Sequence, residues 1–288
     1  MKDNIIFAGC SFTWGQGLWS YMESETHVPS YQEYIFKNME PPSGSMEFKN
    51  TFRFPSLVCN KLNKKSVVKK CNGGTDEESI EFINYLFNKD DFNFTNCFPS
   101  EKYEFDDVSN IIFQTTMMSR SSYRYSWSHN DYILHSTPDR KNLSQLQKIV
   151  YDEGDNPEQI ILPNLDELYD YMYHCDVEIE DILNSMQVDI TNRIEDTLKF
   201  YESKGIKTNI FCWSDEYLNE FSKRPFLMDR FIKIEHDGKT FDCLEHLFNQ
   251  YPEMQIQKDP SVLHFAGIDD HPSKKCHEVI ANSILNNL

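Results

Sequence analysis

The sequence lacks any run of about 18 apolar residues, the length that a helix needs to cross a bilayer. At the N-terminus, Lys2 is followed by a short apolar run. A signal-peptide core needs ~7–15 apolar residues, and this run is shorter. We therefore expect a cytoplasmic protein without membrane partners, and such a chain would suit an intracellular or phage-encoded protein.

Basic residues are scarce: 28 Lys and Arg stand against 46 Asp and Glu, which gives a net charge of −18. An acidic surface repels phosphate backbones and anionic lipid headgroups. We therefore expect no nucleic-acid partner and no binding to an anionic membrane surface. Aromatic residues are plentiful, so the acidity is not that of a disordered tail.

The sequence also lacks a Cys-x-x-Cys pair, although it contains eight cysteines. The cysteines are scattered along the chain, which favours reduced thiols packed as small hydrophobic side chains. We expect neither disulfides nor a metal or organic cofactor.

Strand-like and helical patterns alternate along the chain, which predicts an α/β fold with a mainly parallel sheet. Gly205 is expected to end a long amphipathic helix before the next strand. The expected strands are 4–9, 66–71, 110–115 and 208–213, and the expected helices are 55–63, 76–88, 176–204 and 272–287. Two stretches, 19–53 and 121–175, do not fit a minimal fold. We expect them to be insertions that act as lids or binding loops.

Both ends of the chain carry candidate catalytic residues. Residues 5–11 read Ile-Ile-Phe-Ala-Gly-Cys-Ser, a buried strand that enters a tight turn and presents the hydroxyl of Ser11. Near the other end stand Asp269 and His271, and a serine, a histidine and a carboxylate make up a nucleophilic triad. We choose Asp269 over Asp270 because a residue adjacent to the histidine rarely folds back onto its ring.

Together, in this order, the two ends resemble the SGNH (GDSL-like) hydrolase superfamily. Residues 9–13 (Gly-Cys-Ser-Phe-Thr) match the family's first block, with Cys10 in place of the usual acidic residue, and residues 269–273 (Asp-Asp-His-Pro-Ser) match its last block. The resemblance implies a single domain over 1–288, built as a three-layer α/β/α sandwich of flavodoxin-like type. It also implies a serine esterase that works through an acyl-enzyme on an O-acylated carbohydrate or another small ester.

The family's third block carries an Asn that donates to the oxyanion, and this chain departs from it. Residues 111–116 read Ile-Ile-Phe-Gln-Thr-Thr, so Gln114 and Thr116 are the candidate side-chain donors. The backbone N–H groups of Ser11 and of Gly73 or Gly74 would complete the oxyanion hole. Losing one such donor typically costs ~100- to 1000-fold in rate. Either a substitute donor is present, or activity is weak or absent.

Further residues carry expectations of their own. Arg120, Tyr125 and Trp127 are the candidate substrate contacts, because aromatic faces stack on sugars and arginine pairs with carboxylates. Alternatively, Arg120 pairs with an acid of the protein, and the aromatic segment packs on the domain as a lid. Cys10 is either a buried packing residue or a reactive thiol.

Two other readings stay open. A catalytically silent binding protein on the same scaffold is the alternative function. A zinc site is a further alternative, although the spacing fits no common ligand motif; its candidate ligands are His264, Asp269, Asp270, His271, Cys276 and His277.

Overall fold

The computed structural model describes most of the chain. The described residues are 2–15, 17–23, 43–69, 75–87, 99–116, 122–127, 130–135, 146–150, 158–162, 179–263 and 271–288. For Ser11, Trp14, residues 179–186 and the strands between 122 and 162, only the backbone is described.

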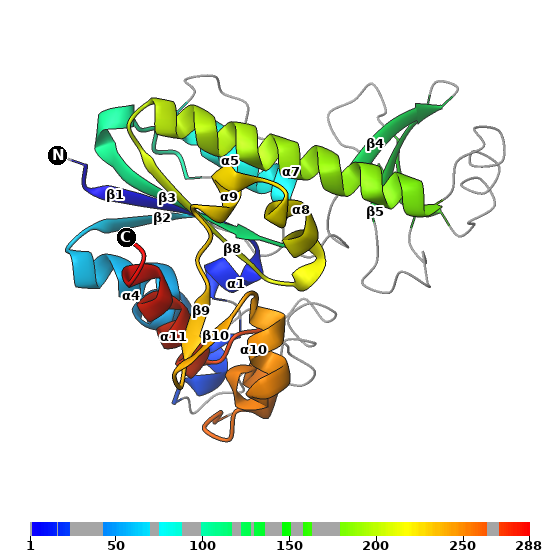
Figure 1. Cartoon of the computed structure of the whole chain (residues 1–288). Helices are drawn as coiled ribbons and strands as arrows, with labels where there is room; N and C mark the ends of the chain where they lie inside the picture. Colours follow the sequence, from blue (N-terminus) through cyan, green and yellow to red (C-terminus); the bar gives the residue numbers. More distant parts are fainter. Residues whose placement is uncertain are drawn as a thin grey trace.

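A four-stranded, all-parallel sheet forms the centre of the fold and confirms the expected α/β class (Figure 1). Its order is β2-β1-β3-β8. The strands are β1 (Asn4–Ala8), β2 (Lys65–Val68), β3 (Val108–Thr115) and β8 (Lys207–Cys212). All four lie within two residues of the expected ranges except at the end of β2, which stops three residues early. Because the strands are parallel, their carboxyl ends meet at one edge of the sheet, where ligands of such folds usually bind.

Each face of the sheet packs against its own helices, as Figure 1 shows. Ile6 and Ala8 of β1 point into a core with α5 (Asp76–Phe87) and α7 (Ile179–Ser203). Ile5 and Phe7 point the other way, into a core with α4 (Phe54–Leu62) and α11 (Lys274–Leu285). A strand buried on both faces reads as a continuous apolar run, and for this reason β1 was readable from sequence.

The spacing of the apolar residues and the residues at the helix ends explain why the helices form where they do. In α7, Ile190, Ile194 and Leu198 are buried at one-turn intervals, and Gly205 follows the helix with a φ of 79°, as expected. Ser273 caps α11, because its Oγ accepts a hydrogen bond from the Cys276 N–H at 3.2 Å.

Short elements follow β8 that the sequence analysis did not anticipate. A two-stranded antiparallel ribbon and three short helices cover the region between β8 and α11. They are α8 (Leu218–Ser222), α9 (Pro225–Met228), β9 (Ile234–His236), β10 (Lys239–Phe241) and α10 (Leu244–Gln250). Five 3-10 turns complete the described elements: η1 (Leu18–Tyr21), η2 (Phe105–Asp107), η4 (Asp215–Tyr217), η5 (Pro252–Met254) and η6 (Ile256–Lys258).

The two expected insertions contain regular structure. The described part of 19–53 includes α3 (Ser45–Phe52), which packs against η1 and α4. Within 121–175 lies a second, antiparallel sheet of order β4-β5-β6-β7. Its strands are β4 (Ser122–Trp127), β5 (Asn130–His135), β6 (Leu146–Val150) and β7 (Glu158–Leu162). Where loops were expected, β-branched and aromatic residues favour strands.

Across the described ranges, every helix is too short or too polar to reach from one side of a membrane to the other.

Candidate functional site

The chain turns sharply at the carboxyl end of β1. Gly9 and Cys10 follow the strand, and Ser11 is the first residue of α1 (Ser11–Trp14). The structure thus places Ser11 at the carboxyl edge of the central strand, while its side chain is outside the described part. The turn closes at Gly15, whose N–H donates to the Phe12 carbonyl at 3.1 Å.

Only glycine fits at position 9. A Cβ there would lie 2.3 Å from Thr13 Oγ1 and 2.9 Å from the Cβ of Gln114. The Thr13 hydroxyl itself donates to Gln114 Oε1 at 2.5 Å, which ties the Ser11 turn to the end of β3. The sequence motif therefore has a packing reason at Gly9 that is independent of chemistry.

His271 lies against this turn. Its side chain is buried, and its ring meets the ring of Phe12 edge-on, with centroids 4.8 Å apart and planes at 74°. Phe12 in turn packs edge-on against Trp213, which follows β8, with centroids 4.0 Å apart. Since Phe12 directly follows Ser11, the fold brings the ring of His271 next to the Ser11 turn.

Backbone hydrogen bonds fix the segment that carries His271. Its carbonyl accepts from the Ile256 N–H at 2.9 Å, and the Ser273 N–H donates to the Met254 carbonyl at 2.6 Å. These bonds join the start of α11 to η5 and η6. The ring of His271 therefore approaches Phe12 from a well-anchored backbone.

His277 is fully buried one and a half turns further on and has a different character. Its Nδ1 accepts from the Phe54 N–H at 3.3 Å, and its ring stacks on Phe54. Burial, and then the charges of His271 and Arg53, lower the pKa of His277 to about 3. His277 is therefore neutral at pH 7. Its Nε2 has no hydrogen-bond partner within the described part of the chain.

At the end of β3, the two candidate oxyanion donors are buried and already engaged. Gln114 Nε2 lies 3.7 Å from the sulfur of Cys10, and its Oε1 accepts from Thr13. The backbone N–H of Thr116 donates to Asp76 Oδ1 at 2.9 Å. Gln114 keeps a second amide hydrogen, so its assignment as a donor stays a prediction, as does that of Thr116.

Asp76 is a buried carboxyl group at this edge that the sequence analysis missed. Besides the Thr116 N–H, it accepts the hydroxyl of Tyr217 at 2.6 Å. Burial raises its pKa to about 8, although both hydrogen bonds favour the charged form. The sequence analysis predicted only a helix over 76–88, and nothing in the acidic residues that begin it marks Asp76 as buried.

Several expected site residues lie outside the described part of the chain. They are Asp269, Gly73, Gly74 and Arg120. Tyr125 and Trp127 are described only by their backbone, on β4, where they pair with Tyr132 and Asn130. Of the six residues weighed as zinc ligands, only His271, Cys276 and His277 are described. No cluster of three metal-ligating side chains occurs within the described ranges.

Five of the eight cysteines lie in the described part of the chain. Cys10, Cys59, Cys212, Cys243 and Cys276 are buried and unbridged. Burial raises the pKa of the Cys276 thiol, so Cys276 packs as a hydrophobic residue.

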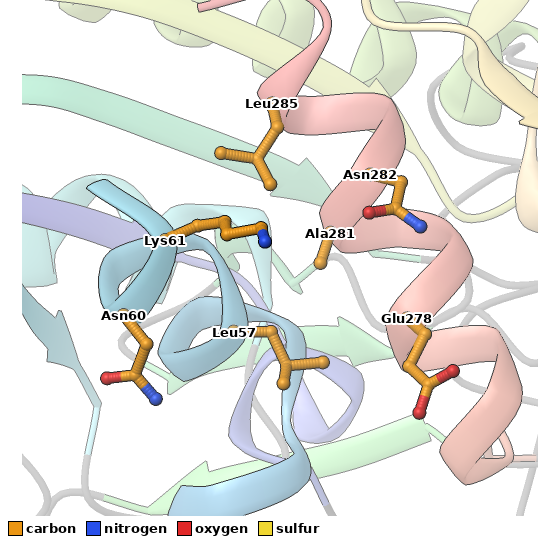
Figure 2. Close-up of a pocket in the computed structure, with 7 residues that line it drawn as sticks. All are labelled: Leu57, Asn60, Lys61, Glu278, Ala281, Asn282 and Leu285. Atoms are coloured by element: carbon orange, nitrogen blue, oxygen red, sulfur yellow. The ribbon is translucent and has the colours of Figure 1, made fainter. Parts of the chain in front are cut away.

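Two cavities lie along α4, α11 and β2. The larger, about 480 Å³, lies between α4 and α11, where Lys61 and Glu278 line it with apolar neighbours (Figure 2). The smaller, about 250 Å³, lies along the last residues of β2, and Arg53 lines it. The smaller hollow is the one at the carboxyl edge of the sheet.

Comparison of the chain with protein-family models, with curated proteins and with solved structures finds no match.

Proposed function

We propose that the chain is a serine ester hydrolase of SGNH type. The observation that carries the proposal is the edge-on packing of His271 against Phe12, the residue next to Ser11. A hydroxyl is a weak nucleophile until a base lies within hydrogen-bond reach, and His271 is the histidine that the fold brings to the Ser11 turn. His277 does not fit the role, because burial lowers its pKa and its Nδ1 already accepts from Phe54.

In the proposed reaction, Ser11 Oγ attacks the ester carbonyl while His271 takes the hydroxyl proton. His271 then gives that proton to the departing alcohol, and water hydrolyses the acyl-enzyme by the same route. Asp269 would orient the His271 ring. The N–H groups of Ser11 and of Gly73 or Gly74 would hold the oxyanion, with Gln114 or Thr116 as a side-chain donor.

The finer description of the fold belongs to the same proposal. Helices on both faces of the parallel sheet support a three-layer α/β/α sandwich, formed as one domain over 1–288. The stretches 19–53 and 121–175 would be insertions that shape the binding site. Arg120, Tyr125 and Trp127 would contact the substrate, a glycan ester or another small ester. We place this activity in the cytoplasm, with no nucleic-acid or membrane partner.

A second candidate function is a binding protein that has lost catalysis. The observation that favours it is the engagement of Gln114 with Thr13 and Cys10, which leaves Gln114 a single amide hydrogen for an oxyanion. In a binder, Ser11 would serve only as the start of α1.

Labelling with a fluorophosphonate separates the two candidates. The hydrolase should be modified at Ser11 and at no other serine, as read by mass spectrometry of the labelled peptide. Ser11→Ala should abolish labelling and the hydrolysis of p-nitrophenyl acetate, and His271→Ala should do the same. Asp269→Asn should reduce the rate more than Asp270→Asn. Hydrolysis that survives intact in Ser11→Ala would exclude the serine mechanism, and a wild-type protein that is never labelled favours the binder.

A further inference from the structure

Arg53 holds an uncompensated charge at the carboxyl edge of the sheet. It lies between α3 and α4, and its Nε donates to Ser56 Oγ at 3.3 Å. Its two terminal nitrogens have no hydrogen-bond or ion-pair partner among the described residues. A guanidinium group carries five N–H donors in a planar fork, so most of the binding capacity of Arg53 is unused.

Arg53 also lines a cavity. The hollow of about 250 Å³ is lined by Arg53 and Asn50, by Val68 and Lys69 at the end of β2, and by Glu101 and Tyr103. Lys69 already pairs with Glu78 at 2.8 Å, and no ion pair joins Glu101 to Arg53. This volume is below the ~300–1,000 Å³ of pockets that enclose a drug-sized ligand, so it suits a small charged group.

Arg53 places a positive charge at this cavity, whereas the chain as a whole is negatively charged. The net charge is −18, yet two basic residues, Lys49 and Arg53, stand four residues apart at the end of α3, and Arg53 lines the cavity. Burial lowers the pKa of Arg53 to about 10, so Arg53 keeps its charge at neutral pH. Burial and the charge of Arg53 lower the pKa of Lys49 to about 6. A charge removed from water without a counter-ion is costly, and an anion would offset that cost.

Two of the residues that line the cavity, Arg53 and Val68, also contact the elements that flank the proposed nucleophile. A Cβ at Gly15, which closes the Ser11 turn, would lie 2.9 Å from the Cβ of Arg53. Val68 pairs with Phe7, four residues before Ser11. A ligand that spans from this cavity to the end of β1 would therefore reach the Ser11 turn.

We propose that this cavity binds an oxyanion of the substrate, a carboxylate or a phosphate, through the terminal nitrogens of Arg53. The assignment of the anion to the substrate rests on the proposed function, whereas the proposal that the cavity binds an anion does not. The fork of an arginine matches both groups with two parallel hydrogen bonds.

The first test measures binding without catalysis. Thermal unfolding is followed in acetate, succinate or inorganic phosphate against chloride at equal ionic strength. The matching anion should raise the Tm of the wild type by about 2–4 °C or more. Arg53→Gln should lose this shift, and Arg193→Gln, which removes the same charge from an exposed position on α7, should keep it. Whichever of carboxylate or phosphate gives the shift identifies the group.

Without an added anion, Arg53→Gln should be at least as stable as the wild type, because the variant removes a half-buried charge that has no ion-pair partner among the described residues. No anion shift in the wild type, or an equal shift in Arg53→Gln, would overturn the proposal. A lower Tm of Arg53→Gln together with an absent shift in the wild type would assign Arg53 a structural role instead.

The second test uses esters. For a p-nitrophenyl ester that carries a free carboxylate (the hemisuccinate), Arg53→Gln should raise KM about 10- to 100-fold with little change in kcat. For neutral p-nitrophenyl acetate it should change neither, and Arg53→Lys should restore part of the KM. Equal effects on both esters would refute recognition of the anion. If the wild type cleaves no ester, the proposed function fails, and the thermal test alone decides the anion site.

Discussion

The ring of His271 stands edge-on to the ring of Phe12, with centroids 4.8 Å apart and planes at 74°. These two residues are separated by nearly the whole length of the chain. Phe12 is held from its other side by Trp213, at 4.0 Å. A histidine ring in this place cannot rotate freely without displacing an aromatic neighbour, so Phe12 is a positioning residue for the proposed base.

Shortening Phe12 should therefore affect rate more than stability. Phe12→Leu should lower kcat for p-nitrophenyl acetate about 100-fold, because a misplacement of ~1 Å can have that effect. The loss in stability should be only about 1 kcal/mol, as for other hydrophobic exchanges in cores. The matched control is Phe241→Leu, which shortens a buried ring in the same core away from the turn. Equal rates for the two variants would show that Phe12 does not position His271.

Gly9→Ala should destabilise the protein strongly. The added Cβ would lie 2.3 Å from Thr13 Oγ1 and 2.9 Å from the Cβ of Gln114, so β1, α1 or β3 must shift. We expect a loss of about 3 kcal/mol in the free energy of unfolding by urea denaturation.

Gly238→Ala provides the control for that measurement. Gly238 has a φ of 70° with open space around it, so this variant meets only backbone strain, about 1 kcal/mol. If Gly9→Ala is no worse than Gly238→Ala, the packing at Gly9 is not as tight as described.

His277 should make stability depend on acid. Its pKa is about 3 in the folded chain, against a usual value near 6.5, so the unfolded chain binds the extra proton. The stabilisation is complete above about pH 6.5 and is lost as the pH falls toward 3, by up to ~1.4 kcal/mol per pH unit. His277→Asn cannot titrate, so it should become relatively more stable at acid pH.

Asp76 should act in the opposite direction. Its folded pKa of about 8 lies above the usual value, so the folded chain holds the proton and stability falls as pH rises from about 4 to 8. Asp76→Asn should flatten this slope. Tyr217→Phe removes a bond that favours the charged carboxylate, so it should steepen the slope at its upper end. Because Asp76 and His277 offset each other between about pH 4 and 6.5, each is measured as the difference between wild type and variant across pH. Parallel profiles for wild type and Asp76→Asn would disprove the shift.

The sequence predicted the central architecture because that part obeys local rules. β1 reads as an apolar run since it is buried on both faces, and α7 ends where Gly205 requires it. The pairing of Ser11 with His271 came instead from the resemblance of the two ends of the chain to a hydrolase family, and the structure shows His271 against Phe12. The features that could not be predicted from the sequence depend on tertiary contacts.

Nothing local in the acidic start of α5 distinguishes Asp76 from its exposed neighbours; the hydroxyl of Tyr217 comes from 141 residues away. Nothing in the local sequence distinguishes Arg53 either. Its place in a cavity depends on α3, β2 and the segment around Tyr103, which line that cavity together. The strands β4 to β7 were missed for another reason: their polar alternation was read as the composition of loops.

The order of the sheet also determines when a newly made chain could first assemble its site. β1 leaves the ribosome well before its partner β3, which begins about a hundred residues later, and α11, which covers α4, follows later still. Until those elements are made, Ile5 and Phe7 lack the neighbours that bury them in the finished fold. Such long-range pairing slows folding and exposes intermediates to aggregation. Removing α11 would leave α4 uncovered, so a chain truncated there should be captured by chaperones, although it contains β1 and every strand of the parallel sheet.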